Sequence, residues 1–355
     1  MTIKHHLKYK APLQAMTNNI KGFITLIILL ILFSPLPMSH AEDAAKNKTG
    51  AYRPILIGEQ RQTPDTEPGK TTASHHFPPI KTHKLASKIT GQTYEIHVML
   101  PVSRIDGSEK FPVLYMTDAN GSIPISQITR TMQTSGELPR FIVVGIGYPV
   151  DTVFHSLYLR QRDLTPSTIA QMRYPIPIEG IVEVETGKKT GGAPEFLAFI
   201  QQELKPFINT NYQTIPEESG YFGISFGGLF GLYVLFHQPD TFNRYVIGSP
   251  ALWWDNEITF SQARKFLENH TALNAEVYMS VGGQEEISQP GRNYVSNVYK
   301  MDALLHSKPL SGFSLKTEVF PSEGHTSVFG LFHSRGLRTV YGPVTCSPFQ
   351  TEGCQ

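Results

Sequence analysis

The sequence predicts an α/β fold with a mostly parallel central sheet flanked by helices. Short, continuous apolar runs at residues 111–116 and 141–146 are typical of strands that are buried on both faces, as in a parallel sheet. Stretches with helical spacing alternate with these runs, for example at residues 193–208, where the apolar side chains share one face. Alternation of strands and helices over most of the chain is the pattern of α/β proteins.

Residues 1–41 are predicted to be a signal peptide that is removed on export. Four lysines precede an apolar run from Phe23 to Phe33, which is shorter than the ~20 residues that a membrane-spanning helix needs. Small residues, Ser39 and Ala41, stand where a signal peptidase would cleave. A retained signal anchor is the alternative. We therefore expect a periplasmic or secreted protein without stable membrane insertion after cleavage.

The charge of the remaining chain limits its partners. Without residues 1–41 it carries 27 basic and 30 acidic residues, a formal net charge of −3. Basic runs interleaved with aromatic residues are absent from the sequence, so nucleic acid is not an expected partner. Residues 42–80 are polar and rich in turn-forming residues, and we interpret them as a linker with little core of its own.

The folded domain is expected at residues 81–345. Tyr94, Ile96 and Val98 alternate with more polar neighbours, as in a half-buried strand. Residues 151–192 are the least regular, and a loop of this length in a compact domain is usually functional or disordered. Three further apolar segments are predicted strands: residues 244–248, 275–281 and 313–320.

A C-terminal tail, residues 346–355, contains both cysteines of the chain, Cys346 and Cys354. In an oxidising compartment these two residues could close a short loop, which would contribute ~2–3 kcal/mol through loop entropy. The alternative is a frayed tail with two free thiols.

A G-x-S-x-G sequence from Gly223 to Gly227 makes Ser225 the candidate nucleophile. An apolar segment precedes it and a helix-like apolar run follows it, so the serine would stand on a sharp turn between a strand and a helix. Such a turn leaves no room for side chains two residues either side of the serine, which explains the two glycines. For a motif this short, a glycine-lined turn in the core is the alternative.

Candidate partners for the serine follow two later strands. His325 lies in the turn after residues 313–320, and catalytic groups collect at the carboxyl ends of strands in α/β sheets. A carboxylate after residues 275–281 would orient its imidazole and stabilise the imidazolium. Glu285 is preferred and Glu286 is the substitute; alternatively, both are solvated loop acids. The chain order serine, acid, histidine is that of α/β-hydrolases.

Two backbone N–H groups are expected to stabilise an oxyanion. One belongs to Phe226, which follows the serine and opens the helix. The second should come from the turn after residues 111–116, at Ala119 or Asn120.

With these residues in place, the chain resembles the Putative esterase family of α/β-hydrolases over about residues 84–341. Within that family it is most similar to the enterochelin-type siderophore trilactone esterases. One departure is Ile224, where histidine is commoner in the family, and this side chain is expected to pack rather than react. The other is the turn at residues 283–286, which leaves the acid assignment open. The resemblance rests on residues 91–94, 160–166, 191–192, 249–254 and 323–325.

The resemblance implies attack of Ser225 on an ester carbonyl, followed by hydrolysis of the acyl-enzyme by a water that His325 deprotonates. Arg160 and Arg162 are candidates to attract an anionic catecholate or carboxylate substrate; the alternative is a loop arginine paired with Asp163. Trp253, with Trp254, is a candidate for an aromatic wall; the alternative is buried packing against a neighbouring helix. No metal or organic cofactor is expected, because the sequence has no HExxH, P-loop, dinucleotide or cysteine–histidine motif.

The leading hypothesis is an exported esterase that acts on a small-molecule ester, with a siderophore trilactone as the candidate. An acyltransferase of the same fold would use the same residues with an alcohol as acceptor. A non-catalytic protein that binds a ligand on a hydrolase scaffold is the alternative from another class, although an intact serine, glycine pair and histidine argue against it. The oligomeric state is left open.

Overall fold

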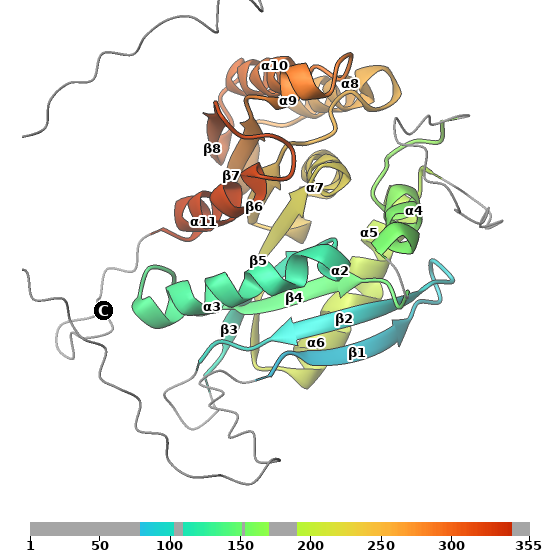
Figure 1. The fold of residues 1–355 in the computed structure, drawn as a ribbon, viewed down its shortest axis with the longest axis vertical. Coiled ribbons are helices and arrows are strands. Elements are labelled where there is room, and N and C mark those ends of the chain that lie inside the picture. Colours follow the sequence, from blue (N-terminus) through green and yellow to red (C-terminus); the bar gives the residue numbers. More distant parts are fainter. Residues whose placement is uncertain (1–78, 103–108, 151–152, 170–189, 343–355) are drawn as a thin grey trace, which may run out of the picture. The chain divides into compact units, whose positions relative to one another are not determined.

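An eight-stranded sheet runs through the part of the chain that the structure describes, residues 79–102, 109–150, 153–169 and 190–342 of a computed structural model (Figure 1). Its strand order is β1-β2-β4-β3-β5-β6-β7-β8. The pairs β1–β2 and β2–β4 are antiparallel, and all later pairs are parallel, which confirms the predicted α/β-hydrolase fold. The strands are β1 (Lys81–Ala86), β2 (Thr93–Met99), β3 (Phe111–Met116), β4 (Ile142–Gly147), β5 (Thr214–Ile224), β6 (Arg244–Gly248), β7 (Ala272–Gly282) and β8 (Ser311–Phe320).

Helices cover both faces of the sheet (Figure 1). On one face, α3 and α11 bury Met132 and Phe332 against sheet residues such as Phe222. On the other face, helices α5, α7, α8 and α10 pack on residues such as Tyr221 and Ile247. The helices are α2 (Ala119–Ser122), α3 (Ser126–Ser135), α4 (Val153–Asp163), α5 (Ala193–Phe199), α6 (Lys205–Asn211), α7 (Phe226–His237), α8 (Trp254–Asn269), α9 (Glu285–Ser288), α10 (Tyr294–His306) and α11 (Val328–Tyr341).

The predicted strands all form. Strands β3 and β6 have the predicted bounds, and β7 and β8 contain the predicted segments 275–281 and 313–320. Strands β7 and β8 pair in parallel from Ala272 and Ser311 to Gly282 and Phe320. The predicted helix at 193–208 is α5 and α6, joined by a π-helical turn at Ile200–Leu204.

Several elements were not predicted, among them helix α3, strand β1 and helix α4. Strand β1 lies at the edge of the sheet with mostly exposed side chains, so it lacks the alternating apolar pattern of a half-buried strand. Helix α4 falls in the segment that we interpreted as irregular, residues 151–192; of that segment, the structure describes residues 153–169 and 190–192.

The predicted signal peptide, nearly all of the linker, and Cys346 and Cys354 lie outside the described residues. Within the described residues, the structure contains no helix with the length and apolar character needed to cross a membrane.

A fully buried histidine joins α3 to α11. His333 Nε2 lies 2.8 Å from the Thr129 hydroxyl oxygen, and its ring meets the Phe222 ring edge-on at 5.5 Å between centroids. Burial disfavours the imidazolium and lowers the pKa of His333 to about 4. The folded protein therefore holds this side chain in its neutral form over the physiological pH range.

This burial predicts a pH-dependent loss of stability. In the unfolded chain His333 takes up a proton near pH 6.5, whereas in the folded chain it does so only near pH 4, so the free energy of unfolding should fall as pH decreases through this window. The full contribution is roughly 3 kcal/mol. Urea denaturation of wild type and His333→Gln at pH 7 and pH 4 measures it, since glutamine does not titrate. Equal losses in the two proteins would show that His333 is not responsible.

Candidate active site

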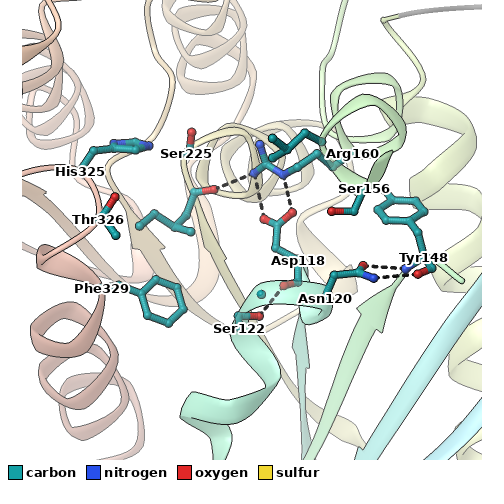
Figure 2. Close-up of a pocket in the computed structure, with 13 residues that line it drawn as sticks. Asp118, Asn120, Ser122, Tyr148, Ser156, Arg160, Ser225, His325, Thr326 and Phe329 are labelled. Carbon is teal, nitrogen blue, oxygen red and sulfur yellow. Dashed lines mark hydrogen bonds and ion pairs between the residues drawn. The ribbon is translucent and has the colours of Figure 1, made fainter. Parts of the chain in front are cut away.

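The residues that the sequence singles out meet at the carboxyl edge of the parallel strands. Asn120 follows β3, Ser225 follows β5, Glu285 follows β7, and His325 follows β8. In a parallel sheet these strand ends lie side by side, so residues far apart in sequence come together there. Figure 2 shows the resulting pocket, with Ser225 and His325 on one side and Asn120 on the other.

Ser225 occupies the turn between β5 and α7 with φ 61° and ψ −117°, a conformation that residues other than glycine seldom adopt. Its N–H donates to the Gly248 carbonyl at 2.9 Å, and its own carbonyl accepts from the N–H of Leu229 at 2.9 Å. A Cβ at Gly223 would lie 2.6 Å from the Gly227 carbonyl carbon, and one at Gly227 would lie 2.6 Å from Thr117 Oγ1. The motif therefore forms the strand–turn–helix that its glycines predict.

Glu285 and His325 form a directly hydrogen-bonded pair. His325 Nδ1 donates to Glu285 Oε2 at 2.5 Å. The other carboxylate oxygen, Oε1, accepts from the Ser249 hydroxyl at 2.6 Å and from the Gly282 N–H at 2.8 Å. Glu285 is fully buried, so these donors supply the hydrogen bonds that water would otherwise make. Because Nδ1 faces the carboxylate, Nε2 is the nitrogen of His325 left for the pocket.

The neighbouring carboxylate, Glu286, has a different environment. It accepts from the N–H groups of Val295 at 2.8 Å and Ser296 at 3.2 Å, and from the Ser296 hydroxyl. These are donors of the first turn of α10, where a helix has free N–H groups and favours negative charge. The two candidate acids thus occupy distinct places: Glu285 binds the histidine and Glu286 caps a helix.

His325 and Ser225 line the same pocket, and the imidazole points toward the serine (Figure 2). Among the described residues, no hydrogen bond joins the Ser225 hydroxyl to this imidazole. The ring of His325 packs against that of Tyr294 at 5.2 Å between centroids. Burial raises the pKa of Tyr294, while the nearby Trp253 and Ser225 side chains act to lower it. The Tyr294 ring is thus a direct neighbour of the predicted base, His325.

The pocket has a volume of about 480 Å³. Leu157, Ile224 and Phe329 give it an apolar part, so Ile224 packs at the site as expected. Its remaining lining residues are polar or small: Asp118, Asn120, Gly121, Ser122, Tyr148, Ser156, Arg160, Ser225, His325 and Thr326.

The expected oxyanion donors lie at the starts of two helices. Phe226 is the first residue of α7, and Asn120 is the second residue of α2. N–H groups in the first turn of a helix have no partner within the helix. The Asn120 side chain is engaged elsewhere: its Nδ2 donates to the Tyr148 carbonyl at 2.7 Å, and its Oδ1 accepts from the Tyr148 N–H at 2.8 Å. These two bonds hold the Asn120 side chain on the Tyr148 backbone, and its backbone N–H remains the expected oxyanion donor.

Of the three expected substrate-binding residues, Arg160 lines the pocket, whereas Arg162 and Trp253 do not. Arg160 lines it and forms a two-pronged ion pair with Asp118. Arg162, predicted to share this role, is not among the lining residues, because its guanidinium is bound to the buried Asp163 at 2.6 and 3.0 Å. The anticipated pairing with Asp163 thus belongs to Arg162 and not to Arg160.

Trp253 also lies outside the lining residues of the pocket. Its ring packs against Phe226 at 5.9 Å between centroids, and the Arg292 guanidinium lies 4.5 Å from its ring centroid. These contacts correspond to the packing alternative considered for this residue.

Sequence reasoning missed several residues of the site. Asp118 is one of them, although a polar residue soon after a buried strand is a signal for the site edge of a sheet. Ser249 likewise follows β6 and reaches Glu285. Tyr294 gave no local signal, because only the packing of α10 brings it to His325. Within the described residues, no group of three His, Cys, Asp or Glu side chains is arranged to hold a metal ion.

Comparison with known proteins shows that the chain is similar to esterases. A family model described as "Putative esterase" matches residues 171–298. The chain is 30% identical over 295 residues to the ferri-bacillibactin esterase BesA of Bacillus subtilis, which covers 80% of this chain and 97% of that protein. It is 35% identical over 220 residues to a siderophore enterobactin esterase of Emericella nidulans, covering 55% and 70%. The BES protein from Bacillus cereus superposes with a TM-score of 0.63 at 27% identity, covering 78% of this chain and 99% of that one.

Proposed function

Because the chain belongs to the Putative esterase family, in its siderophore-esterase branch, we propose that it is an exported serine esterase that hydrolyses a siderophore trilactone through an acyl-enzyme on Ser225. Ester hydrolysis follows from membership of this branch, since the relatives are ester hydrolases. The serine mechanism, the trilactone substrate and the export are our proposal.

The observation that carries the mechanism is the hydrogen bond of 2.5 Å between Glu285 and His325 beside the strained Ser225 turn. A buried carboxylate on Nδ1 sets the tautomer of the imidazole and stabilises the imidazolium that forms when the ring takes a proton. The free nitrogen, Nε2, is on the side of the pocket that contains Ser225. This arrangement supports the roles of nucleophile, general base and orienting acid for the three residues.

In the proposed reaction, His325 Nε2 removes the proton of the Ser225 hydroxyl as its oxygen attacks the ester carbonyl. The carbonyl oxygen becomes an oxyanion that the N–H groups of Phe226 and Asn120 stabilise. Collapse of this intermediate breaks the bond to the leaving alcohol, which takes the proton from His325. A water that gives its proton to His325 then attacks the acyl-enzyme. The bond between the acyl group and the Ser225 oxygen breaks, the carboxylic acid leaves, and His325 returns the proton to the serine.

The choice of substrate rests on two observations. Relatives that align over most of their own length include esterases named for ferri-bacillibactin, enterobactin and triacetylfusarinine C. The pocket also combines an apolar part at Leu157, Ile224 and Phe329 with polar groups. Such a lining suits an ester whose polar backbone carries aromatic groups, as a catecholate trilactone does.

Export is supported by the basic and apolar pattern of residues 1–41 and by the small residues that end it. A periplasmic or secreted enzyme would meet a siderophore outside the cytoplasm. This placement also disfavours S-formylglutathione, a cytosolic thioester that other esterases of this family hydrolyse.

We predict that Ser225→Ala and His325→Ala each lower kcat on p-nitrophenyl butyrate by roughly 10⁴-fold or more, because the first removes the nucleophile and the second removes the general base.

A panel of linear esters, feruloyl esters and catecholate trilactones, followed by chromatography, should show the highest kcat/KM for the trilactones. Absence of Ser225 labelling by a fluorophosphonate in the folded protein would favour a non-catalytic binding protein, and transfer to an added alcohol would favour an acyltransferase.

The two adjacent carboxylates should differ in their effects. Glu285→Gln is expected to lower kcat by roughly 10²–10⁴-fold, because glutamine cannot stabilise the imidazolium. Glu286→Gln should instead lower the free energy of unfolding by about 1 kcal/mol, the usual cost of a lost helix cap. Steady-state kinetics and urea denaturation of both variants separate these effects. A larger loss of kcat in Glu286→Gln would reverse the assignment.

Expression with the native N-terminus should give a mature chain that begins at Glu42. Ala41→Tyr places a bulky residue at the cleavage site and should leave the precursor uncleaved, whereas Ala45→Tyr, beyond the site, should be processed normally. Intact-mass measurement of the periplasmic or secreted fraction reads out both variants. A wild-type chain that keeps residues 1–41 would support the signal anchor.

A further inference from the structure

We propose that the Asp118–Arg160 ion pair is a positioning device, which holds the turn after β3 against the Ser225 turn so that both oxyanion donors stay aimed at one point. This inference rests on the proposed serine mechanism and gives Arg160 a role other than anchoring substrate. The two residues come from α4 and from the residue before α2, and meet at the wall of the pocket (Figure 2).

The pair has the geometry of a fixed contact. Arg160 Nε donates to Asp118 Oδ1, and an η-nitrogen donates to Oδ2 at 2.9 Å, so both carboxylate oxygens are bound by one guanidinium. The side chains are only 12% and 18% exposed. Two parallel hydrogen bonds fix the relative orientation of the groups as well as their distance, and partial burial reduces screening by water. The carboxylate therefore holds its place relative to α4.

Asp118 passes this constraint to the turn that contains Asn120. Its backbone is left-handed, with φ 63°, a conformation that costs a non-glycine residue roughly 1–2 kcal/mol. Its carbonyl accepts from the N–H of Gly121 at 3.0 Å and from the N–H and hydroxyl of Ser122 at 2.9 and 2.8 Å. The direction of the Ala119 and Asn120 N–H groups thus depends on how Asp118 is held.

Arg160 also contacts the nucleophile turn itself. The same η-nitrogen lies 3.4 Å from the Ile224 carbonyl oxygen, and the guanidinium carbon lies 5.3 Å from the centroid of the Phe226 ring. The Asp118 carboxylate also lies close to the nucleophile turn. A Cβ placed on Gly227 would be only 3.2 Å from Asp118 Oδ2. One ion pair therefore bridges the turn that precedes Asn120 and the turn that precedes the Phe226 N–H.

Helix α4 is itself anchored three residues further on. The buried carboxylate of Asp163 accepts from the hydroxyls of Tyr94 at 2.9 Å and Tyr148 at 3.0 Å, and from Arg162. Tyr94 belongs to β2, and Tyr148 follows β4, so this network attaches the end of α4 to the sheet. A rigid α4 is what allows Arg160 to act as a reference point for both turns.

A substrate anchor predicts the opposite response to mutation. If Arg160 bound an anionic substrate, Asp118 would compete for it, and Asp118→Asn should strengthen binding of an anionic ester. If the pair positions the oxyanion donors, Asp118→Asn and Arg160→Gln should both lower kcat, whatever the charge of the substrate, because stabilisation of the transition state is lost.

The test is steady-state kinetics of Arg160→Gln, Arg160→Lys, Asp118→Asn and the double variant Asp118→Asn/Arg160→Gln. The substrates are neutral p-nitrophenyl butyrate and the anionic mono-p-nitrophenyl succinate. We expect kcat to fall by roughly 10–100-fold on both esters, less than the loss of a whole oxyanion donor, with KM changed by less than about twofold. The double variant should be no slower than the slower single variant, since either change breaks the same pair.

Arg140→Gln is the matched control. Arg140 is also paired with a carboxylate, Glu109, and its guanidinium carbon lies 5.8 Å from the Phe111 ring centroid, but the pair sits before β3 and β4, at the opposite edge of the sheet. Its kcat should equal that of wild type. Circular dichroism melting checks that every variant folds. If Arg160→Gln is unstable, Arg160→Lys replaces it in the test, because lysine keeps the positive charge but cannot form the two-pronged ion pair.

The rate at which a fluorophosphonate labels Ser225 should fall in the same variants, because the developing phosphoryl oxyanion uses the same donors. Unchanged kcat in Arg160→Gln and Asp118→Asn with an active wild type would overturn this inference alone. A rise in KM confined to the anionic ester, or tighter binding of that ester by Asp118→Asn, would assign Arg160 to the substrate. An inactive, unlabelled wild type would overturn the serine mechanism and this inference together.

Discussion

A carboxylate removed from water organises the candidate site. Glu285 is fully buried, and an ion in that position is tolerated only when hydrogen-bond donors replace its hydration. Its donors come from three places: Ser249 after β6, Gly282 at the end of β7, and His325 after β8. The ends of these three neighbouring strands and the loops that follow them must therefore keep one mutual arrangement. The hydrogen bond from His325 Nδ1 to Glu285 also leaves Nε2 as the nitrogen that faces the pocket, where the proposed base must act.

Local pattern accounts for most of the sheet and for the core of the site. Strands β3 and β6 begin and end where their apolar runs do, because a strand covered on both faces leaves a continuous signal. The turn at Ser225 is predictable because its steric demands fall on residues that are adjacent in sequence. Glu285 and His325 are predictable for another reason. A parallel sheet brings the carboxyl ends of its strands to one edge, so residues that follow different strands in sequence lie close together in the fold.

The partners of charged side chains are not accessible in this way. Near Arg160 and Arg162 the sequence offers Asp163, whereas the carboxylate that binds Arg160 lies 42 positions earlier in the chain. Which loop approaches a guanidinium is decided by tertiary packing, and a local pattern has no record of it. Strand β1 and helix α4 escape prediction for a related reason. An exposed edge strand and a helix held by polar contacts have no periodic apolar stripe to reveal them.

The register between β7 and β8 fixes the relative position of Glu285 and His325, which follow these two strands. Gly282 stands opposite Phe320, and the acid and the base follow these two residues in their respective loops. A slip of a single residue would displace one loop along the other by about 3.3 Å and turn every side chain of the slipped strand to the opposite face. That displacement exceeds the 2.5 Å between Glu285 Oε2 and His325 Nδ1, so it would break their hydrogen bond. Insertions and deletions within these two strands should therefore be far less acceptable than changes of side chain, even at positions remote from any bound ester.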